Sequence, residues 1–223
     1  MIELGNSVII VAGGVGARMN ASVPKQFLLL GGRPILMHTI EAFVAFDSGI
    51  KIVVVLPADQ LDYWKELCSK HEFTINHQTT TGGSNRFESV KNGLELTPDE
   101  GPIGIHDGVR PLITSETIKS IYQEAFVFGH AIPVVPPTES MRRIDCYENH
   151  VVDRNNLRLI QTPQVFKARL IKDAYLRDYS EHFTDDATVL EAAGHKIHLC
   201  DGQTGNIKIT TKEDLKIAKA ILS

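Results

Sequence analysis

The 223-residue sequence has little cysteine, no long hydrophobic run and no excess of positive charge. Its three cysteines, Cys68, Cys146 and Cys200, form no Cys-x-x-Cys pair, which argues against a disulfide framework or a cysteine-based zinc site. Reduced cysteines suit the cytosol, so we expect a cytoplasmic protein. The longest wholly apolar runs have five residues, whereas a membrane span needs about 20. The first residues lack the basic and long apolar regions of a secretory signal, so we expect neither such a signal nor a membrane partner.

The balance of charge is slightly acidic. Lys and Arg number 23 against 27 Asp and Glu, which gives a formal net charge of −4. A protein that binds nucleic acid without regard to sequence would carry a basic face or tail, so we expect no nucleic-acid partner. A few converging cations can still form a positive cleft for a small anion. The sequence lacks His-Glu-x-x-His and Gly-x-Ser-x-Gly, which leaves zinc proteases and serine hydrolases without support.

Short runs rich in Val and Ile alternate with segments of helical period. The runs predict strands that are apolar on both faces, at Ser7–Val11, Lys51–Leu56, Pro102–His106 and Ala131–Val135. The helical segments are Pro34–Phe46, Asp59–Lys70, Asn85–Leu96, Thr114–Phe128 and a last one from Thr211. This order predicts an α/β fold with a doubly wound, mostly parallel, Rossmann-like sheet in a single domain of residues 1–223. Its ligands should bind outside the carboxyl ends of the strands.

One stretch, at about residues 134–160, interrupts this alternation. It contains Pro136-Pro137, paired arginines and short β-like pieces around Asn149–Asp153. These features predict an arm that ends in a β-hairpin. An isolated hairpin is too small to have a hydrophobic core, so it must pack against another surface. We expect a second copy of the chain, and hence a homodimer through the arm.

The strongest chemical signal follows the first strand. Gly13, Gly14 and Gly16 form a glycine loop, and the cations Arg18 and Lys25 come shortly after. Glycines after a strand let backbone N–H groups form a nest for anionic oxygens. The dinucleotide pattern fails because Met19 replaces its last glycine, and no P-loop motif occurs. A polyphosphate attacked at its inner phosphorus would suit a nest with two cations; the alternative is an ordinary strand-to-helix turn.

Two further groups lie near predicted strand ends. Gly83, Ser84 and Asn85 precede a helix, where Asn85 and Glu88 have the spacing of a capping box. This helix start can contact a nucleotide, although capping alone also explains Ser84 and Asn85. Asp107 follows another strand and can hold a ribose hydroxyl or a metal. Its pairing with Arg110 can equally be structural.

Hydroxyl and basic side chains recur through the second half of the chain. They are the groups that a second, phosphorylated substrate would need. For Arg142 and Arg143 we favour a solvated surface instead. The candidates are Ser140, Arg154, Thr162, Thr184 and Lys208.

Together these motifs resemble the cytidylyltransferases that act on 2-C-methyl-D-erythritol 4-phosphate in the non-mevalonate isoprenoid route. The resemblance covers residues 9 to about 218. It rests on Gly-Gly-x-Gly-x-Arg-Met, Pro-Lys-Gln, Gly-x-x-Arg-x-x-Ser, His-Asp-x-x-Arg-Pro, Val-Asp-Arg, Gln-Thr-Pro-Gln and Asn-Ile-Lys-Ile-Thr, in the family's order. Each piece alone is unspecific, but the combination is highly specific.

The resemblance implies a role for each candidate. Nucleotide contacts would come from Ala12, Gly13, Gly14, Gly16, Arg18, Lys25, Gly83, Ser89, Asp107 and Arg110. The second substrate would face Asp107, Ser140, Arg154, Thr162, Thr184 and Lys208, with Ser140 and Arg154 supplied across the dimer by the partner's arm. Catalysis would rest on Arg18, Lys25, Arg154 and Lys208. Two residues depart from the family pattern: Ser84 replaces a frequent acid, and Ser140 replaces a threonine.

The implied reaction transfers CMP from CTP to the polyol phosphate and releases pyrophosphate. Mg²⁺, held mainly by the CTP phosphates, would be the cofactor, and no protein metal site is expected. Two alternatives stay open. One is a cytidylyltransferase for ribitol 5-phosphate or a related polyol phosphate, and the other is a catalytically silent module that binds nucleotide or dimerises.

Overall fold

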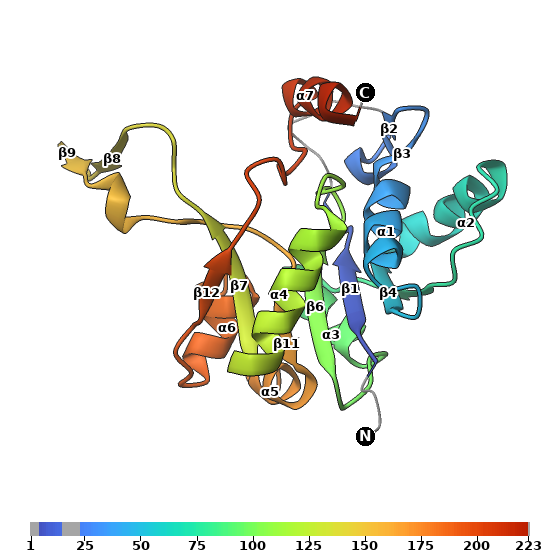
Figure 1. The fold of residues 1–223 in the computed structure, drawn as a ribbon, viewed down its shortest axis with the longest axis horizontal. Helices are drawn as coiled ribbons and strands as arrows, with labels where there is room; N and C mark the ends of the chain where they lie inside the picture. The colour runs from blue at the N-terminus through green and yellow to red at the C-terminus, as the bar shows by residue number, and fades with distance from the viewer. Residues whose placement is uncertain (1–4, 15–22, 223) are drawn as a thin grey trace.

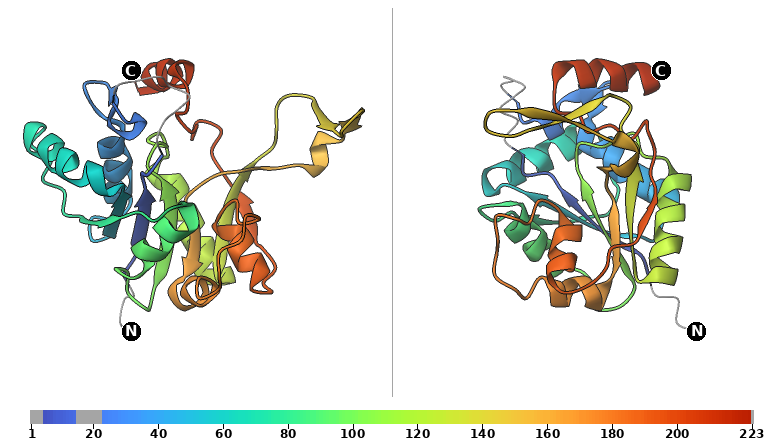
Figure 2. Two further views of the ribbon diagram at one scale, coloured as in Figure 1. Left: turned by 180° about the vertical axis from the view of Figure 1, so that it is seen from behind. Right: turned by 90° about the vertical axis from the view of Figure 1, so that its left-hand side faces the viewer.

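The computed structural model describes residues 5–14 and 23–222, which form one mixed sheet with helices on both faces (Figures 1 and 2). The sheet has eight strands. Seven follow the order β10-β7-β11-β6-β1-β4-β5, and β12 pairs with β7 beside this path. Their bounds are β1 Ser7–Val11, β4 Lys51–Leu56, β5 Gln78–Thr81, β6 Pro102–Asp107, β7 His130–Val135, β10 Leu159–Ile160, β11 Gln164–Lys167 and β12 Leu199–Asp201.

The centre of the sheet is parallel. Strand β1 pairs in parallel with β4 and β6, and β4 with β5. Strand β11 runs antiparallel between β6 and β7, and β10 is antiparallel to β7. The predicted α/β class with a mostly parallel sheet is therefore confirmed, with β11 and β10 as the reversed strands.

Side-chain alternation along the central strands explains the two helical layers. Val8 and Ile10 point to one face, in a cluster with α1 (Ile35–Phe46), α2 (Leu61–Lys70) and α4 (Ser115–Phe128). Ile9 and Val53 point to the other face, in a cluster with α3 (Arg86–Leu94), α5 (Ala168–Ala174) and α6 (Asp186–Ala192). Because successive strand residues face opposite sides, strands that are apolar at every position need helices on both.

The predicted helices are present with shifted starts. Helix α1 begins at Ile35, and Pro34, expected at its first position, is the capping residue before it. The last helix, α7, spans Lys212–Leu222. Of its apolar residues Leu215, Ala218, Ile221 and Leu222, only Ala218 is buried, and Ile221 and Leu222 are about half exposed. In the described part of the chain, no helix is long and apolar enough to cross a membrane. The three cysteines are unpaired.

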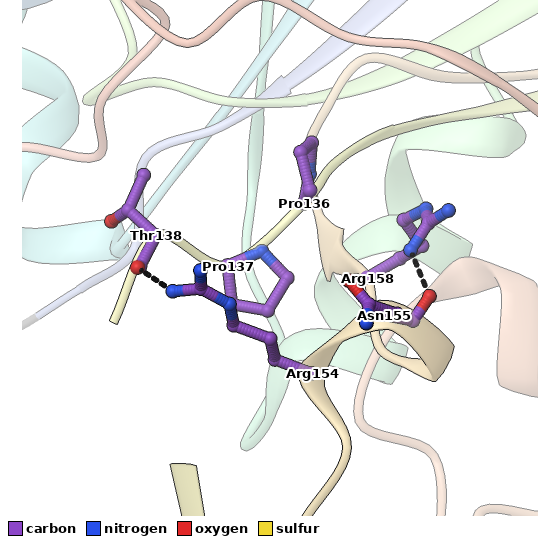
Figure 3. Close-up of a pocket in the computed structure, with 6 residues that line it drawn as sticks. All are labelled: Pro136, Pro137, Thr138, Arg154, Asn155 and Arg158. Carbon is purple, nitrogen blue, oxygen red and sulfur yellow. Dashed lines mark hydrogen bonds between the residues drawn. The ribbon is translucent and has the colours of Figure 1, made fainter. Parts of the chain in front are cut away.

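The arm leaves the body after β7 and carries a two-stranded hairpin at its tip (Figure 1). Strand β8, Met141–Ile144, pairs with β9, Asn149–Val152. The chain returns through a short 3₁₀ turn at Arg154–Asn156. A pocket of about 510 Å³ is formed by the segments that lead to and from the hairpin, and is lined by Pro136, Pro137, Thr138, Arg154, Asn155 and Arg158 (Figure 3). The predicted hairpin is confirmed, whereas its part in a dimer stays a prediction.

Candidate active site

A cleft of about 330 Å³ lies at the carboxyl ends of the parallel strands. Val11, the last residue of β1, is in register with Asp107, the last residue of β6, so the ends of these strands coincide. The lining residues come from loops after four strands and from a distant segment near residue 208: Val11, Ala12, Gly13, Gly14, Lys25, Gln26, Pro57, Gly82, Gly83, Ser84, Asn85, Arg86, Ser89, Asp107, Val109 and Lys208. This is the position at which open α/β sheets bind their ligands.

Lys25 lies directly over the glycine turn. It opens a 3₁₀ turn, Lys25–Phe27, fixed by the buried ring of Phe27. A Cβ atom on Gly14 would stand 2.8 Å from Lys25 Cε and 3.0 Å from Lys25 Nζ. A larger residue at Gly14 would therefore have to displace the lysine. Gly16 and Arg18, the other predicted members of this loop, lie outside the described residues.

Asp107 is the electrostatic centre of the cleft. Its Oδ2 lies 3.1 Å from Lys208 Nζ and 3.1 Å from Arg110 Nε, and only 12% of its side chain is exposed. Burial alone would raise the pKa of Asp107, but Lys208, Arg86 and Arg110 outweigh it and hold the pKa well below its usual range. Asp107 is therefore ionised at neutral pH and acts as an acceptor of hydrogen bonds, not as a general acid.

Lys208 reaches the cleft because the segment around it is anchored on both sides. Ile209 is fully buried, and its N–H donates to the carbonyl of Val109. Asn206, 1% exposed, donates from Nδ2 to the carbonyl of Thr162 at 2.9 Å. The structure thus brings Lys208 to the cleft that Gly13 and Gly14 line, although nearly 200 residues separate them in the chain.

The loop before α3 presents its backbone to the cleft. Asn85 caps the helix by accepting from the Glu88 N–H, as predicted. The reciprocal half of the capping box differs, because the Glu88 carboxylate accepts from the N–H of Ser84 instead of that of Asn85. Ser89 is buried below, where its Oγ accepts from the Gly83 N–H at 3.1 Å. Gly83 and Ser89, both predicted nucleotide contacts, line the same wall.

Gly83→Ala should disrupt this loop. A Cβ there would stand 2.2 Å from Glu88 Cβ, so the loop must shift, at a cost of about 1–3 kcal/mol in the free energy of unfolding. We expect a lower denaturant midpoint and weaker nucleotide binding. Gly5→Ala is the control, because no atom lies within 4 Å of its Cβ position. Equal midpoints for the two variants would contradict this account of the loop.

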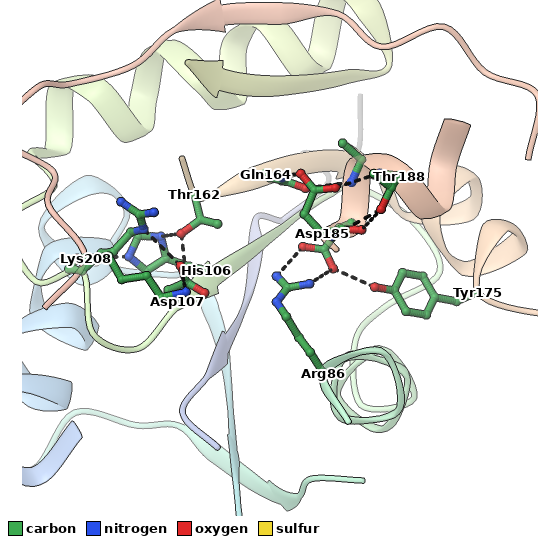
Figure 4. Close-up of polar contacts among 12 residues, drawn as sticks. Arg86, His106, Asp107, Thr162, Gln164, Tyr175, Asp185, Thr188 and Lys208 are labelled. Carbon is green, nitrogen blue, oxygen red and sulfur yellow. Dashed lines mark hydrogen bonds and ion pairs between the residues drawn. The ribbon is translucent and has the colours of Figure 1, made fainter. Parts of the chain in front are cut away.

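Thr162 is buried next to Asp107 and holds its backbone in place (Figure 4). Its Oγ1 accepts from the Asp107 N–H at 3.0 Å and lies 3.1 Å from His106 Nδ1. His106 Nε2 lies 3.1 Å from the carbonyl oxygen of Arg110, which can only accept, so Nε2 carries the proton and the Thr162 hydroxyl donates to Nδ1. Burial lowers the pKa of His106 to about 4, so this ring is neutral.

Acid should therefore destabilise the protein through His106. The unfolded chain takes up a proton below pH 6.5, while folded His106 stays neutral down to about 4. Stability is thus lost as the pH falls between those values. Between pH 7 and 5, wild type should lose about 2 kcal/mol more than His106→Gln, at about 1.4 kcal/mol per pH unit. Urea titrations at both pH values measure this, and equal losses would show that His106 does not titrate in this way.

Several predicted residues lie outside the cleft lining. Arg110 pairs with Asp107 and donates to the carbonyl of Asn206 at 2.8 Å. Its ion pair with Asp107 is the structural alternative to a nucleotide contact that the sequence left open. Thr184 is exposed in the segment before α6. Ser140 and Arg154 are exposed on the arm, where Arg154 donates to the carbonyl of Thr138. The substrate roles of these residues stay predictions.

Arg86 is a lining residue to which the motif analysis assigned no role. Its guanidinium makes a bidentate ion pair with fully buried Asp186, at 2.8 and 2.6 Å (Figure 4). Burial works against the charge, but Asp186 outweighs it and raises the pKa of Arg86 above its usual range. The Gly-x-x-Arg-x-x-Ser motif contained the residue, but nothing local indicated a partner one hundred positions away.

The site is locally positive in an acidic protein. Its described lining carries three cations, Lys25, Arg86 and Lys208, and one carboxylate, Asp107. No group of three or more potential metal ligands occurs among the described residues. Asp107 is the one carboxylate of the described lining, and two cations already hold it. Such a donor set fits a metal that arrives with an anionic ligand, not a cage built by the protein.

An α/β sheet with a positive, glycine-walled cleft at the ends of its parallel strands is typical of a protein that binds a nucleotide. The family model for 2-C-methyl-D-erythritol 4-phosphate cytidylyltransferase matches residues 7–223. The enzyme of that name from Bacteroides thetaiotaomicron is 50% identical over 216 residues, 97% of this chain and 99% of the relative. That from Phocaeicola vulgatus is 49% identical over 215 residues, 96% and 98% of the two chains. This chain belongs to that family.

Solved structures agree. The 4-diphosphocytidyl-2C-methyl-D-erythritol synthase of Anaerococcus prevotii superposes with a TM-score of 0.81 at 29% identity, over 98% of this chain and 96% of that one. The 2-C-methyl-D-erythritol 4-phosphate cytidylyltransferase of Thermus thermophilus gives 0.79 at 28% identity, over 97% and 98%. The resemblance indicated by the sequence motifs is confirmed.

Proposed function

We propose that the chain transfers CMP from CTP to 2-C-methyl-D-erythritol 4-phosphate, giving 4-diphosphocytidyl-2-C-methyl-D-erythritol and pyrophosphate. The observation that carries the proposal is the meeting of Lys25, Asp107 and Lys208 around the Gly13-Gly14 turn. Two ammonium groups beside exposed backbone N–H groups suit a triphosphate. The carboxylate of Asp107, beside Lys208, suits a sugar hydroxyl.

The reaction needs no side-chain base. The nucleophile is an oxygen of the polyol phosphate, which is already ionised because the second pKa of a phosphomonoester is about 6. This oxygen forms a bond to the α-phosphorus of CTP, and the bond from that phosphorus to the leaving pyrophosphate oxygen breaks. The protein's work is to hold two anions in line and to stabilise the charge that builds up between them. Asp107, which is ionised and paired with two cations, can help to position a substrate and is not needed as a base.

Each cation has a distinct place in this scheme. Lys25, over Gly14, would stabilise charge on the triphosphate and the leaving pyrophosphate. Lys208, paired with Asp107, would face the attacking phosphate. Arg18 would join Lys25, as the family motif implies. Mg²⁺ held mainly by the CTP phosphates would offset the repulsion between the two substrates.

The arm would complete the site across a homodimer, with Ser140 and Arg154 reaching the partner's second substrate. Both residues are exposed on a hairpin that projects from the body (Figure 2). Exposed Ile144, Tyr147 and Val151 at its tip, 75–99% accessible, suit burial against another chain. The unpaired cysteines fit a cytoplasmic enzyme.

Mixed dimers should test the shared site. Lys25→Ala and Arg154→Ala are each expected to be nearly inactive. In a dimer of one of each, one site keeps its own Lys25 and receives an intact arm, so random mixing should restore about a quarter of the sites. Mixing Lys25→Ala with Lys208→Ala is the control, because these defects lie on one side of the interface and every site stays damaged. No recovery in the first mixture would contradict a site completed by the partner.

A comparison of substrates tests the function itself. Pyrophosphate release is measured with CTP and Mg²⁺ on 2-C-methyl-D-erythritol 4-phosphate and on ribitol 5-phosphate in parallel. The proposal predicts a far higher kcat/KM for the first. A preference for ribitol 5-phosphate would establish the alternative polyol, and CTP binding without any turnover would establish a silent nucleotide-binding module.

A further inference from the structure

Arg86 lines the cleft and is close both to the loop before α3 and to Asp107. It is the first residue of α3, next to the loop of Gly83 to Asn85 on the predicted nucleotide side. Its charge also acts on Asp107, at the centre of the cleft. The side chain is 30% exposed and lines the cleft, while both terminal nitrogens of its guanidinium pair with buried Asp186.

Asp186 is built to hold this arginine. It is fully buried, and it also accepts a hydrogen bond of 2.7 Å from the hydroxyl of Tyr175. A buried carboxylate that pairs with an arginine and accepts from a tyrosine hydroxyl is a firm anchor, because loss of the arginine would leave an uncompensated charge in the interior. The pair therefore fixes the distance between the start of α3 and the start of α6.

The anchored segment carries a predicted substrate residue. Asp186 is the first residue of α6, and Thr184 lies two positions before it. Phe183, between α5 and α6, stacks on Phe87 of α3 with ring centroids 5.6 Å apart. Gln164 fixes the other side of this segment, donating to Asp185 Oδ2 and accepting from the Ala187 N–H. Residues 183–187 are thus held between α3 and β11.

We propose that Arg86 is a positioning residue that couples the nucleotide side of the cleft to residues 183–187, and through them to the second substrate. The inference rests on the proposed function. When nucleotide binds against the part of the cleft that Arg86 lines, it restrains Arg86. The ion pair with Asp186 then restrains residues 183–187. Without the pair, nucleotide still binds through the glycine turn and Ser89, but Thr184 is no longer held in place.

Asp186→Asn tests this route while leaving Arg86 on the cleft wall. We expect kcat/KM for 2-C-methyl-D-erythritol 4-phosphate to fall about tenfold or more, mainly through KM, as a misplaced contact residue would produce. The Kd for CTP, measured by calorimetry, should stay within about twofold of wild type. Hydrogen exchange should report the coupling directly: CTP should slow the backbone amides of residues 183–187 in wild type and not in the variant.

A second variant guards against misfolding. Arg86→Gln with Asp186→Asn removes both charges, so no unpaired ion stays buried, and it should show the same raised KM. The matched control is Arg169→Gln with Glu100→Gln, an exposed pair at 3.3 Å outside the cleft lining, which should behave as wild type.

Three results would overturn the proposal: an unchanged KM in a folded variant, an equal loss of CTP affinity, or CTP protection of residues 183–187 that survives in Asp186→Asn. If wild type itself turns over no polyol phosphate, the proposed function fails, and the exchange experiment with CTP still decides the coupling.

Discussion

Lys25→Ala is expected to lower kcat about 10²–10³-fold, the loss typical of removing one preorganised group that stabilises charge in a transition state. The physical reason is the place of the ammonium group directly over Gly14, at the turn where the triphosphate should bind. The side chain is only half-buried, so its truncation opens no cavity in the core. Steady-state pyrophosphate release gives the rate, and thermal unfolding should give an unchanged midpoint.

The control for Lys25 is Lys65→Ala. Lys65 is 69% exposed on α2 and pairs with Asp62, another exposed residue. Surface pairs of this kind contribute little, so neither rate nor stability should change. A folded Lys25→Ala protein with wild-type turnover would remove Lys25 from the mechanism.

Lys208→Ala should cause a loss of similar size, about 10²–10³-fold in kcat/KM for the polyol phosphate. Asp107 would keep its contact with Arg110, so its carboxylate does not become unpaired and the fold should survive. The variant loses the cation that we propose faces the attacking phosphate, so KM for the polyol phosphate should rise. Lys208→Arg keeps the charge and should recover part of the activity.

Lys216→Ala provides the comparison for Lys208, since Lys216 is exposed on α7 and does not line the cleft. Circular dichroism and thermal unfolding separate catalytic loss from structural loss. If Lys208→Ala loses activity only in proportion to unfolded protein, Lys208 supports the fold and has no part in the reaction.

The sequence predicts the central strands well because their burial on both faces leaves a local signal. β1, β4, β6 and β7 read as continuous apolar runs. β5 was missed because it is an edge strand of sequence Gln-Thr-Thr-Thr, with no buried side chain. β11 was missed as well. It has four residues, and its reversed direction follows from the return of the arm, which no local pattern encodes.

The site residues likewise divide into those that a local motif predicts and those whose contacts depend on tertiary structure. The glycine turn, Lys25, Asp107 and Lys208 were assigned to one site from motifs, and the structure places them around one cleft. The roles of Arg86 and Thr162 depend on contacts at long range. Arg86 meets Asp186 one hundred positions away, and Thr162 binds the backbone of Asp107 at a separation of 55. Such pairings follow from tertiary packing, which local spacing cannot reveal.

The most direct test of the account is a structure with CTP and Mg²⁺ bound. The account predicts the triphosphate against the Gly13-Gly14 turn, with Lys25 Nζ in hydrogen-bond distance of its oxygens and Lys208 beside the α-phosphate. A second positive pocket, lined by Arg154 and Arg158 on the arm, is an alternative binding site for CTP (Figure 3). CTP seated there within a single chain, with Lys25 and Lys208 untouched, would contradict the account.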